Sequence, residues 1–161
     1  MSYEKTVWAG EGTLAREQEY NDHWCYERGI ITKAWLDVYA ATGDRRFYDA
    51  AKANVDQYVT ADGEILTYEP DKYNLDMICM GRTALRLFKA TGEAKYEKAC
   101  RRLIEQIKGQ PTTAEGGFWH KKLYPQQMWL DGIYMACPFL TEFAVTFGEM
   151  QWADLAAKQK I

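Results

Sequence analysis

A repeated ten-residue segment constrains the fold of this 161-residue chain more than any other feature. The segment TGDRRFYDAA begins at Thr42, TGEAKYEKAC begins at Thr91, and a weaker third copy, FGEMQWADLA, begins at Phe147. The copies place glycines at positions 43, 92 and 148, which are 49 and then 56 residues apart. Self-similarity at such a spacing indicates a chain that is built from repeated supersecondary units.

Each copy predicts two helices that are joined by a tight turn. Apolar residues recur at helical spacing before each glycine, and a second amphipathic pattern follows it. Glycine is the preferred residue just after a helix, and the acid that follows each glycine suits the first turn of the next helix. The sequence therefore predicts an all-α chain with helical hairpins at roughly 20–60, 74–108 and 129–161.

Two longer connections separate the predicted hairpins. They are TADGEILTYEPDKYN, in which EILTY is a possible short strand, and KGQPTTAEGGFWHKKLYPQQM. Because the short turns lie at one end of the hairpins, we expect the long connections to gather at the other end. In repeat architectures that end is usually the binding face.

The composition excludes several classes of protein. The hydrophobic fraction of 47% and the charged fraction of 27% are ordinary for a globular domain. With a net charge of −3 and no basic block, nucleic acid is not an expected partner. The N-terminus has no apolar signal segment, and no apolar run is long enough for a membrane span, so a cytoplasmic location is expected. The four cysteines form no metal-binding pattern with either histidine, and neither metal nor cofactor is predicted.

Two acids occupy matching positions in the repeat. Asp76 lies 16 residues before Gly92, and Asp131 lies 17 residues before Gly148, where the first helix of each unit begins. Each acid could be an N-cap or first-turn acid, which is the commoner role, or both could project into one cleft. Because bulky apolar residues such as Trp129 flank Asp131, we expect poor solvation to raise its pKa.

Several residues near these acids have two interpretations each. His120 could pin a loop by a hydrogen bond or bind a ligand, and Lys121 and Lys122 could be solvated or face an acidic substrate. Tyr124 and Trp129 could fill the core or form sugar platforms. Trp24 and Tyr26 precede the first repeat and would join the same cleft if the long connections cluster.

Four segments together resemble one enzyme family. The sequences WCYERG, TGDRRFYDAA, YNLDMICMG and EGGFWHKKLYPQQMWLDGIYMACPF are similar to glycoside hydrolase family 105, the unsaturated rhamnogalacturonyl hydrolases. The likeness runs from about Trp24 to Trp152. It implies an (α/α)6 barrel, of which residues 1–161 hold about three of six hairpins, a half toroid that corresponds to the N-terminal half of the domain.

The resemblance also implies a reaction and its residues. Asp131 matches the family's general acid, which protonates C4 of a 4,5-unsaturated galacturonyl residue so that water adds at C5. Asp76 matches the second acid, which binds substrate hydroxyls and tunes Asp131. The remaining matches imply substrate binding without metal or cofactor by His120, Lys121, Tyr124, Trp24, Tyr26 and Trp129.

Alternatives remain open at the level of the sequence. The chain could be a catalytically incomplete half-barrel that binds sugars or a protein, or a relative of the unsaturated glucuronyl hydrolases. A half-barrel would expose the apolar flank of its last hairpin. We therefore expect it to associate with another half, with itself or with the C-terminal half of the same domain.

Overall fold

The computed structural model describes residues 3–16 and 22–159, and this part of the chain is helical. The ends of the first and third predicted hairpins, residues 20–21 and 160–161, lie outside the described residues. The prediction of an all-α fold is confirmed. The α-helices are α1 (Tyr3–Leu14), α2 (Tyr26–Thr42), α3 (Arg45–Asp56), α4 (Gly81–Thr91), α5 (Ala94–Lys108), α6 (Leu130–Phe147) and α7 (Gln151–Ala157), with short 3-10 helices η2 (Pro70–Lys72) and η3 (Leu75–Ile78).

The repeated glycines end the first helix of each pair. Gly43, Gly92 and Gly148 have φ angles of 72°, 71° and 72°, in the left-handed region that side chains disfavour. Each donates its N–H to a carbonyl four residues earlier, as a helix cap requires. The helices pair as α2 with α3, α4 with α5 and α6 with α7. Helices α3 and α5 begin one residue later than predicted, because Asp44 and Glu93 are their N-cap residues and not residues of the first turn.

The threonine before the glycine explains why the first two copies resemble each other most. The Thr42 hydroxyl donates to the carbonyl of Val38 at 2.7 Å and accepts the N–H of Asp44 at 3.0 Å. Thr91 makes the same two bonds, to Leu87 at 2.8 Å and from Glu93 at 3.1 Å. One hydroxyl therefore joins the end of one helix to the start of the next, and the third copy, with Phe147, lacks it.

Helix α1 packs against the first hairpin, and no repeat had indicated it. The indole nitrogen of Trp35 donates to the Thr13 hydroxyl at 2.8 Å, and Arg46 pairs with Glu11 at 3.1 Å. A Cβ at Gly10 would lie only 2.6 Å from the ring of Phe47, so glycine permits this close approach.

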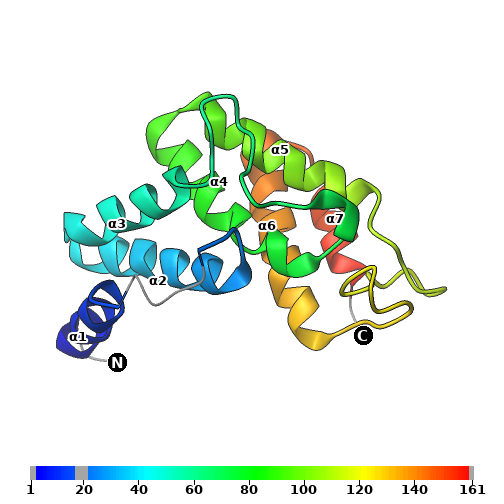
Figure 1. Ribbon diagram of the computed structural model, residues 1–161, viewed down its shortest axis with the longest axis horizontal. Coiled ribbons are helices and arrows are strands. Elements are labelled where there is room, and N and C mark those ends of the chain that lie inside the picture. The colour runs from blue at the N-terminus through cyan, green and yellow to red at the C-terminus, as the bar shows by residue number, and fades with distance from the viewer. Residues whose placement is uncertain (1–2, 17–21, 160–161) are drawn as a thin grey trace.

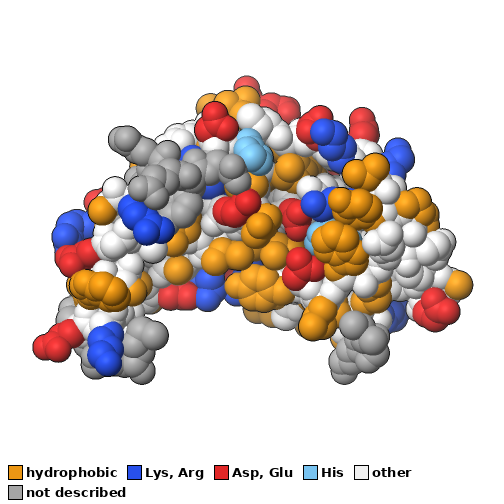
Figure 2. Space-filling model, turned by 60° about the horizontal axis from the view of Figure 1, so that its bottom comes forward, with side chains coloured by type: hydrophobic (Ala, Val, Ile, Leu, Met, Phe, Trp, Pro, Cys, Tyr) orange, Lys and Arg blue, Asp and Glu red, His pale blue; other side chains and the backbone are white. Residues whose placement is uncertain are grey.

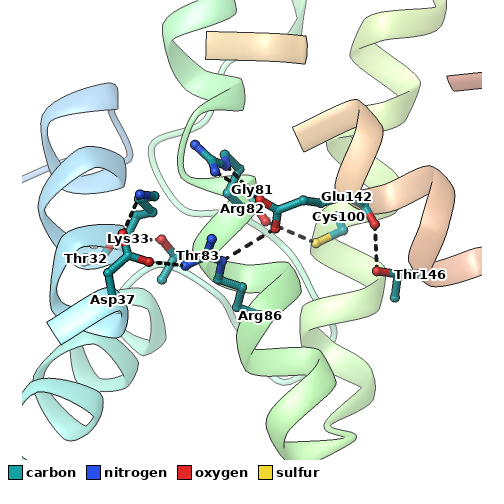
Figure 3. A network of polar contacts seen from close by, with 10 residues as sticks. All are labelled: Thr32, Lys33, Asp37, Gly81, Arg82, Thr83, Arg86, Cys100, Glu142 and Thr146. Atoms are coloured by element: carbon teal, nitrogen blue, oxygen red, sulfur yellow. Dashed lines mark hydrogen bonds and ion pairs between the residues drawn. The ribbon is translucent and has the colours of Figure 1, made fainter. Parts of the chain in front are cut away.

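The first helices of the three hairpins lie side by side and are joined by polar contacts (Figure 3). Arg86 on α4 pairs with Asp37 on α2 at 2.7 Å and with Glu142 on α6 at 3.5 Å. The buried hydroxyls of Thr32 on α2 and Thr83 on α4 lie 2.9 Å apart. These contacts fix the three helices relative to one another, so that their N-terminal ends share one side of the molecule (Figure 1).

The hairpins follow one another along an arc (Figure 1). Figure 2 shows that the arc is hollowed along its lower edge, where apolar side chains gather near carboxylates. The possible strand EILTY does not form. In its place, Ile65 makes an isolated antiparallel bridge with Val59. Among the described helices, none has the length and apolar character that crossing a membrane requires.

Candidate functional site

The connection between α5 and α6 is an ordered loop that fixes His120. The His120 N–H donates to the carbonyl of Gln127 at 2.8 Å, and its carbonyl accepts the N–H of Leu75 at 3.0 Å. Lys122 bonds the backbone of Lys72 at 3.1 Å. The loop is therefore attached to the segment that precedes α4, and the two predicted long connections do meet.

Two buried glutamines hold this loop in place, and sequence reasoning missed both. Gln110 donates to the carbonyls of Tyr73 and Trp119 at 2.9 and 2.8 Å. Gln159, after α7, accepts the N–H of Phe118 at 2.8 Å. Glutamine is usually exposed, so nothing in the sequence distinguishes these two from surface residues. They satisfy loop backbone groups that water would otherwise bond.

Asp76 is a half-buried carboxylate with two hydrogen-bond donors. Its Oδ1 lies 3.2 Å from His120 Nε2 and its Oδ2 lies 2.7 Å from Lys121 Nζ, and 13% of the side chain is exposed. Burial acts to raise the pKa of Asp76, but the hydrogen bonds and charges of His120 and Lys121 outweigh it and lower the pKa below its usual value. Asp76 is therefore held as a carboxylate.

Asp131 lies on the opposite edge of the same imidazole. It is in the first turn of α6, and its Oδ1 is 4.0 Å from His120 Nδ1. The two acids that match in the repeat thus stand on either side of one histidine. The expectation that Asp131 is poorly solvated is wrong for this structure, because 57% of its side chain is exposed.

Both acids lie in the first turn of a helix, which is one of the two structural roles expected for them, and neither is an N-cap. Asn74 is the N-cap of η3, and its side chain accepts the N–H of Asp76 at 3.0 Å. Trp129 is the N-cap of α6, and Asp131 lies two residues after it. Since neither carboxylate caps a helix, Asp76 can pair with His120 and Lys121, and Asp131 is left 57% exposed.

Three of the predicted aromatic or ring-bearing residues form a stack. The ring of Trp129 lies 4.4 Å from that of His120 with an interplanar angle of 10°, and 5.1 Å from that of Tyr124 with an angle of 15°. Trp129 is 39% exposed, whereas His120 is 1% exposed. The indole therefore shields the imidazole and presents a ring to solvent beside Asp131.

The two aromatics before α2 have different positions. Trp24 is fully buried, and its indole nitrogen donates to the carbonyl of Met77 at 2.6 Å. Its predicted contact with substrate does not fit this structure, because no part of the ring reaches solvent; it supports the segment that carries Asp76. Tyr26 is 36% exposed. The negative charge of Glu27 raises the pKa of Tyr26, and the charge of Asp76 raises it further by a smaller amount.

We call Asp76, His120 and Asp131 the acid row. An open cavity of about 430 Å3 lies next to it. Lys121 connects the two, since it lines the cavity and pairs with Asp76. Lys122 is exposed and lies over the ring of Tyr73 at 5.7 Å, as a solvated lysine can. The lining residues are Asp71, Lys72, Asn74, Lys121, Lys122 and Leu123. Within residues 3–16 and 22–159, no group of three or more His, Cys, Asp or Glu side chains could hold a metal ion.

Comparison with known families assigns the chain. Residues 5–161 match the family model described as Glycosyl Hydrolase Family 88. The chain belongs to this family. A solved structure of a family 105 glycoside hydrolase from C. acetobutylicum ATCC 824 is also similar, with a TM-score of 0.89 and 36% sequence identity. The match covers 99% of this chain and 44% of that chain.

The comparison decides two of the sequence predictions. The resemblance to glycoside hydrolase family 105 is confirmed, and so is a partial helical-barrel fold of that family's kind. This family 88 chain spans less than half the length of the solved relative. The acid row of Asp76, His120 and Asp131 therefore lies in a chain that belongs to a glycoside hydrolase family.

Proposed function

We propose that this chain carries the acid-bearing part of a glycoside hydrolase active site. The enzyme would remove a 4,5-unsaturated galacturonyl residue from the non-reducing end of rhamnogalacturonan oligosaccharides by hydration of the enol ether. The observation that supports this most is the row of Asp76, His120 and Asp131, with contacts of 3.2 and 4.0 Å along it. A carboxylate held ionised beside a second, exposed carboxyl is a common arrangement for acid–base work.

The exposed member of the row suits proton transfer. Asp131 would protonate C4 of the unsaturated sugar, and the positive charge would develop at C5, next to the ring oxygen. Water would then add at C5 and lose a proton to the Asp131 carboxylate, which restores the acid. The resulting hemiketal opens and releases the remaining oligosaccharide. This sequence needs one acid that acts twice, unlike the paired displacement of most glycosidases.

The surroundings of the row suit an acidic sugar. Asp76 would accept hydrogen bonds from substrate hydroxyls, since it stays a carboxylate between His120 and Lys121. The ring of Trp129, which is 39% exposed, offers apolar surface that a sugar can contact. The lysine-bearing cavity of about 430 Å3 lies on the other side of Lys121 and suits the continuation of a negatively charged oligosaccharide.

The open side of the arc suits a further helical partner. Along α6, side chains three or four residues apart line an open, largely apolar cavity of about 600 Å3. These residues are Leu130, Ile133, Tyr134, Cys137, Pro138, Thr141 and Glu142. In the proposal, this face packs against a second copy or against the C-terminal half of the same domain, and the partner supplies the rest of the wall around Asp131.

The reaction can be followed by the ultraviolet absorbance of the enol ether. We expect the protein to remove this absorbance from unsaturated galacturonyl-rhamnose faster than from an unsaturated chondroitin disaccharide. Asp131→Asn should lower the rate by at least about 10²-fold, as expected for loss of a general acid. Asp49→Asn, an exposed acid on α3 that lines neither the acid row nor the lysine-bearing cavity, is the control and should keep the rate. Unchanged turnover in Asp131→Asn would assign the acid elsewhere.

A further inference from the structure

A chain of three hydrogen-bonded side chains connects α5 to the segments that carry Asp76 and His120. Gln106, near the end of α5, and Gln110, just after it, are only 3% and 6% exposed. Tyr68, from the connection between α3 and α4, donates its hydroxyl to Gln106 Oε1 at 2.8 Å. Gln106 Nε2 in turn donates to Gln110 Oε1 at 3.2 Å. We call these three side chains the amide chain.

Backbone carbonyls fix the orientation of the Gln110 amide. Its Nε2 donates to the carbonyls of Tyr73 and Trp119 at 2.9 and 2.8 Å. A carbonyl oxygen can only accept, so both hydrogens of this amide must point toward these two oxygens. The Gln110 Oε1 therefore faces the other way, and its partner must be a donor.

The same accounting fixes the Gln106 amide. Its Nε2 donates to the carbonyl of Asn74 at 3.2 Å and to Gln110 Oε1, which uses both of its hydrogens. Its Oε1 is then left to accept the hydroxyl hydrogen of Tyr68. All four amide hydrogens of the two glutamines have acceptors, and the hydrogen bonds run in one direction, from Tyr68 to the backbone.

The carbonyls at the end of the amide chain lie just before Asp76 and His120. Asn74 is two residues before Asp76, and its side chain accepts the Asp76 N–H at 3.0 Å. Trp119 directly precedes His120. Because Gln110 bonds both segments at once, a single amide fixes their separation. The side chains of these segments meet with 3.2 Å between His120 Nε2 and Asp76 Oδ1.

Tyr73 has a backbone conformation that its own residue type disfavours. Its φ is 46°, in the left-handed region, and such a conformation persists only where the surroundings hold it. Gln110 holds the Tyr73 carbonyl at 2.9 Å. Gly109 admits the ring, since a Cβ there would lie 2.8 Å from the Tyr73 hydroxyl. Loosening the amide chain should therefore let the segment before Asp76 relax.

We propose that Tyr68, Gln106 and Gln110 are positioning residues that keep Asp76 and His120 in contact. They act through these two residues and touch no reacting atom. The part of the inference that concerns catalysis rests on the proposed function, in which Asp76 binds substrate hydroxyls. Burial raises the pKa of the Tyr68 phenol, so that its hydroxyl keeps the hydrogen with which the chain begins.

The pKa of Asp76 reports this contact without any substrate. The hydrogen bonds and charges of His120 and Lys121, which face Asp76 from the loop, lower its pKa against the opposing effect of burial. Tyr26 on α2 also lies within range of its charge. The titration can be followed by 13C NMR of the aspartate carboxyl groups, with the signal assigned by its loss in Asp76→Asn.

Two substitutions loosen the amide chain at different points. Tyr68→Phe removes the hydroxyl that directs Gln106, and Gln106→Met keeps the length of the side chain but removes both donor hydrogens. In each variant we expect the pKa of Asp76 to rise toward that of an ordinary aspartate, further in Gln106→Met. Its kcat/KM should fall by about 10-fold, because a small displacement of a binding group is costly. If Gln106→Met does not fold, Tyr68→Phe alone decides.

Tyr96→Phe is the matched control. The Tyr96 hydroxyl also donates one hydrogen bond, to Asp56 Oδ1 at 2.6 Å, but at the other end of α5. Its loss should lower stability while leaving both the pKa of Asp76 and kcat/KM as in the wild type. An Asp76 titration that neither Tyr68→Phe nor Gln106→Met changes overturns the inference, and so does an equal shift in Tyr96→Phe.

The two proposals fail separately. If the pKa of Asp76 moves as expected and the wild-type protein hydrates no unsaturated uronide, the positioning stands and the proposed substrate is wrong. If the enzyme is active and the variants shift this pKa but keep kcat/KM, the proposed function stands and the role of the amide chain in catalysis is wrong.

Discussion

Asp76 and Asp131 match in the sequence but differ in environment. Asp76 is 13% exposed and bonded to His120 and Lys121, whereas Asp131 is 57% exposed and 4.0 Å from the same imidazole. Two carboxyl groups whose surroundings differ in this way can divide the work, one staying ionised and one carrying the proton. The repeat placed both acids correctly, but it could not predict the difference, which arises from which side chains turn toward each carboxylate.

The depressed pKa of Asp76 predicts a specific dependence of stability on pH. A carboxyl whose folded pKa lies below its unfolded value, near 3.9 for an aspartate, stabilises the fold above that value. This contribution is lost as the pH falls through the lower, folded pKa. Asp76→Asn should therefore reduce the free energy of unfolding by about 2 kcal/mol at pH 7 and by much less in strong acid.

Urea unfolding of wild type and variant at pH 7 and at successively lower pH measures this difference. Asp71→Asn is the matched control, since Asp71 is exposed and lies five residues earlier. Its unfolding free energy should follow that of the wild type at every pH. A constant gap between Asp76→Asn and wild type down to the acid limit would contradict the ionic role of Asp76.

The eight predicted site residues came from two sources, the repeat and the family resemblance. The repeat and its matched acids predicted Asp76 and Asp131 from spacing alone. The family resemblance added His120, Lys121, Tyr124 and Trp129, which the structure brings into contact with one another or with the acids. The proposed contact of Trp24 with substrate is contradicted by its burial. The sequence could not predict this, because tryptophan occurs both in cores and at ligand sites.

At the scale of the helices, the glycine turns are the strongest prediction from the sequence. Left-handed backbone at Gly43, Gly92 and Gly148 follows directly from the residue type and its place after an apolar pattern. Helix α1 had no such signal, since it has no repeat partner and carries two glycines. The 3-10 helix η3 was also missed, because Leu75 to Met80 has the same apolar spacing as the start of an α-helix.

Two identical substitutions should have opposite effects on stability. Ala at Gly92 meets no atom within 4 Å, yet its φ of +71° disfavours any side chain, so Gly92→Ala should lower the unfolding free energy by about 1 kcal/mol. Gly12 lies inside α1 and also has open space. Gly12→Ala should raise stability by about 0.5–1 kcal/mol, because alanine is the better helix former.

Chemical denaturation of the two variants and the wild type checks this pair. Because the added methyl group is the same, a difference in sign can come only from the backbone conformation at each site. Equal effects at Gly92 and Gly12 would contradict the assignment of Gly92 as a left-handed helix cap.

At the scale of the whole molecule, one side of α6 lines an open cavity that no other described helix lines. The stripe of Leu130, Ile133, Tyr134, Cys137, Pro138 and Thr141 continues one turn further to Val145, which is 68% exposed. Residues at this spacing form one helix face, and a continuous apolar face of this kind marks a contact surface. The solved relative, of which this chain covers 44%, has further chain with which such a face can pack.

We therefore expect the 18.6 kDa chain to associate through this face. In analytical ultracentrifugation its weight-average mass should rise above the monomer value as concentration increases, because burying the stripe removes apolar surface from water. The double substitution Thr141→Lys and Val145→Lys puts two charges on the stripe, about three to four helical turns from Asp131, and should return the protein to monomer. Ala53→Lys, on the exposed side of α3, adds charge away from the stripe and should leave association unchanged. A wild-type protein that stays monomeric at every concentration would contradict self-association, and the stripe would then have to be covered by a different helical partner before the wall around Asp131 is complete.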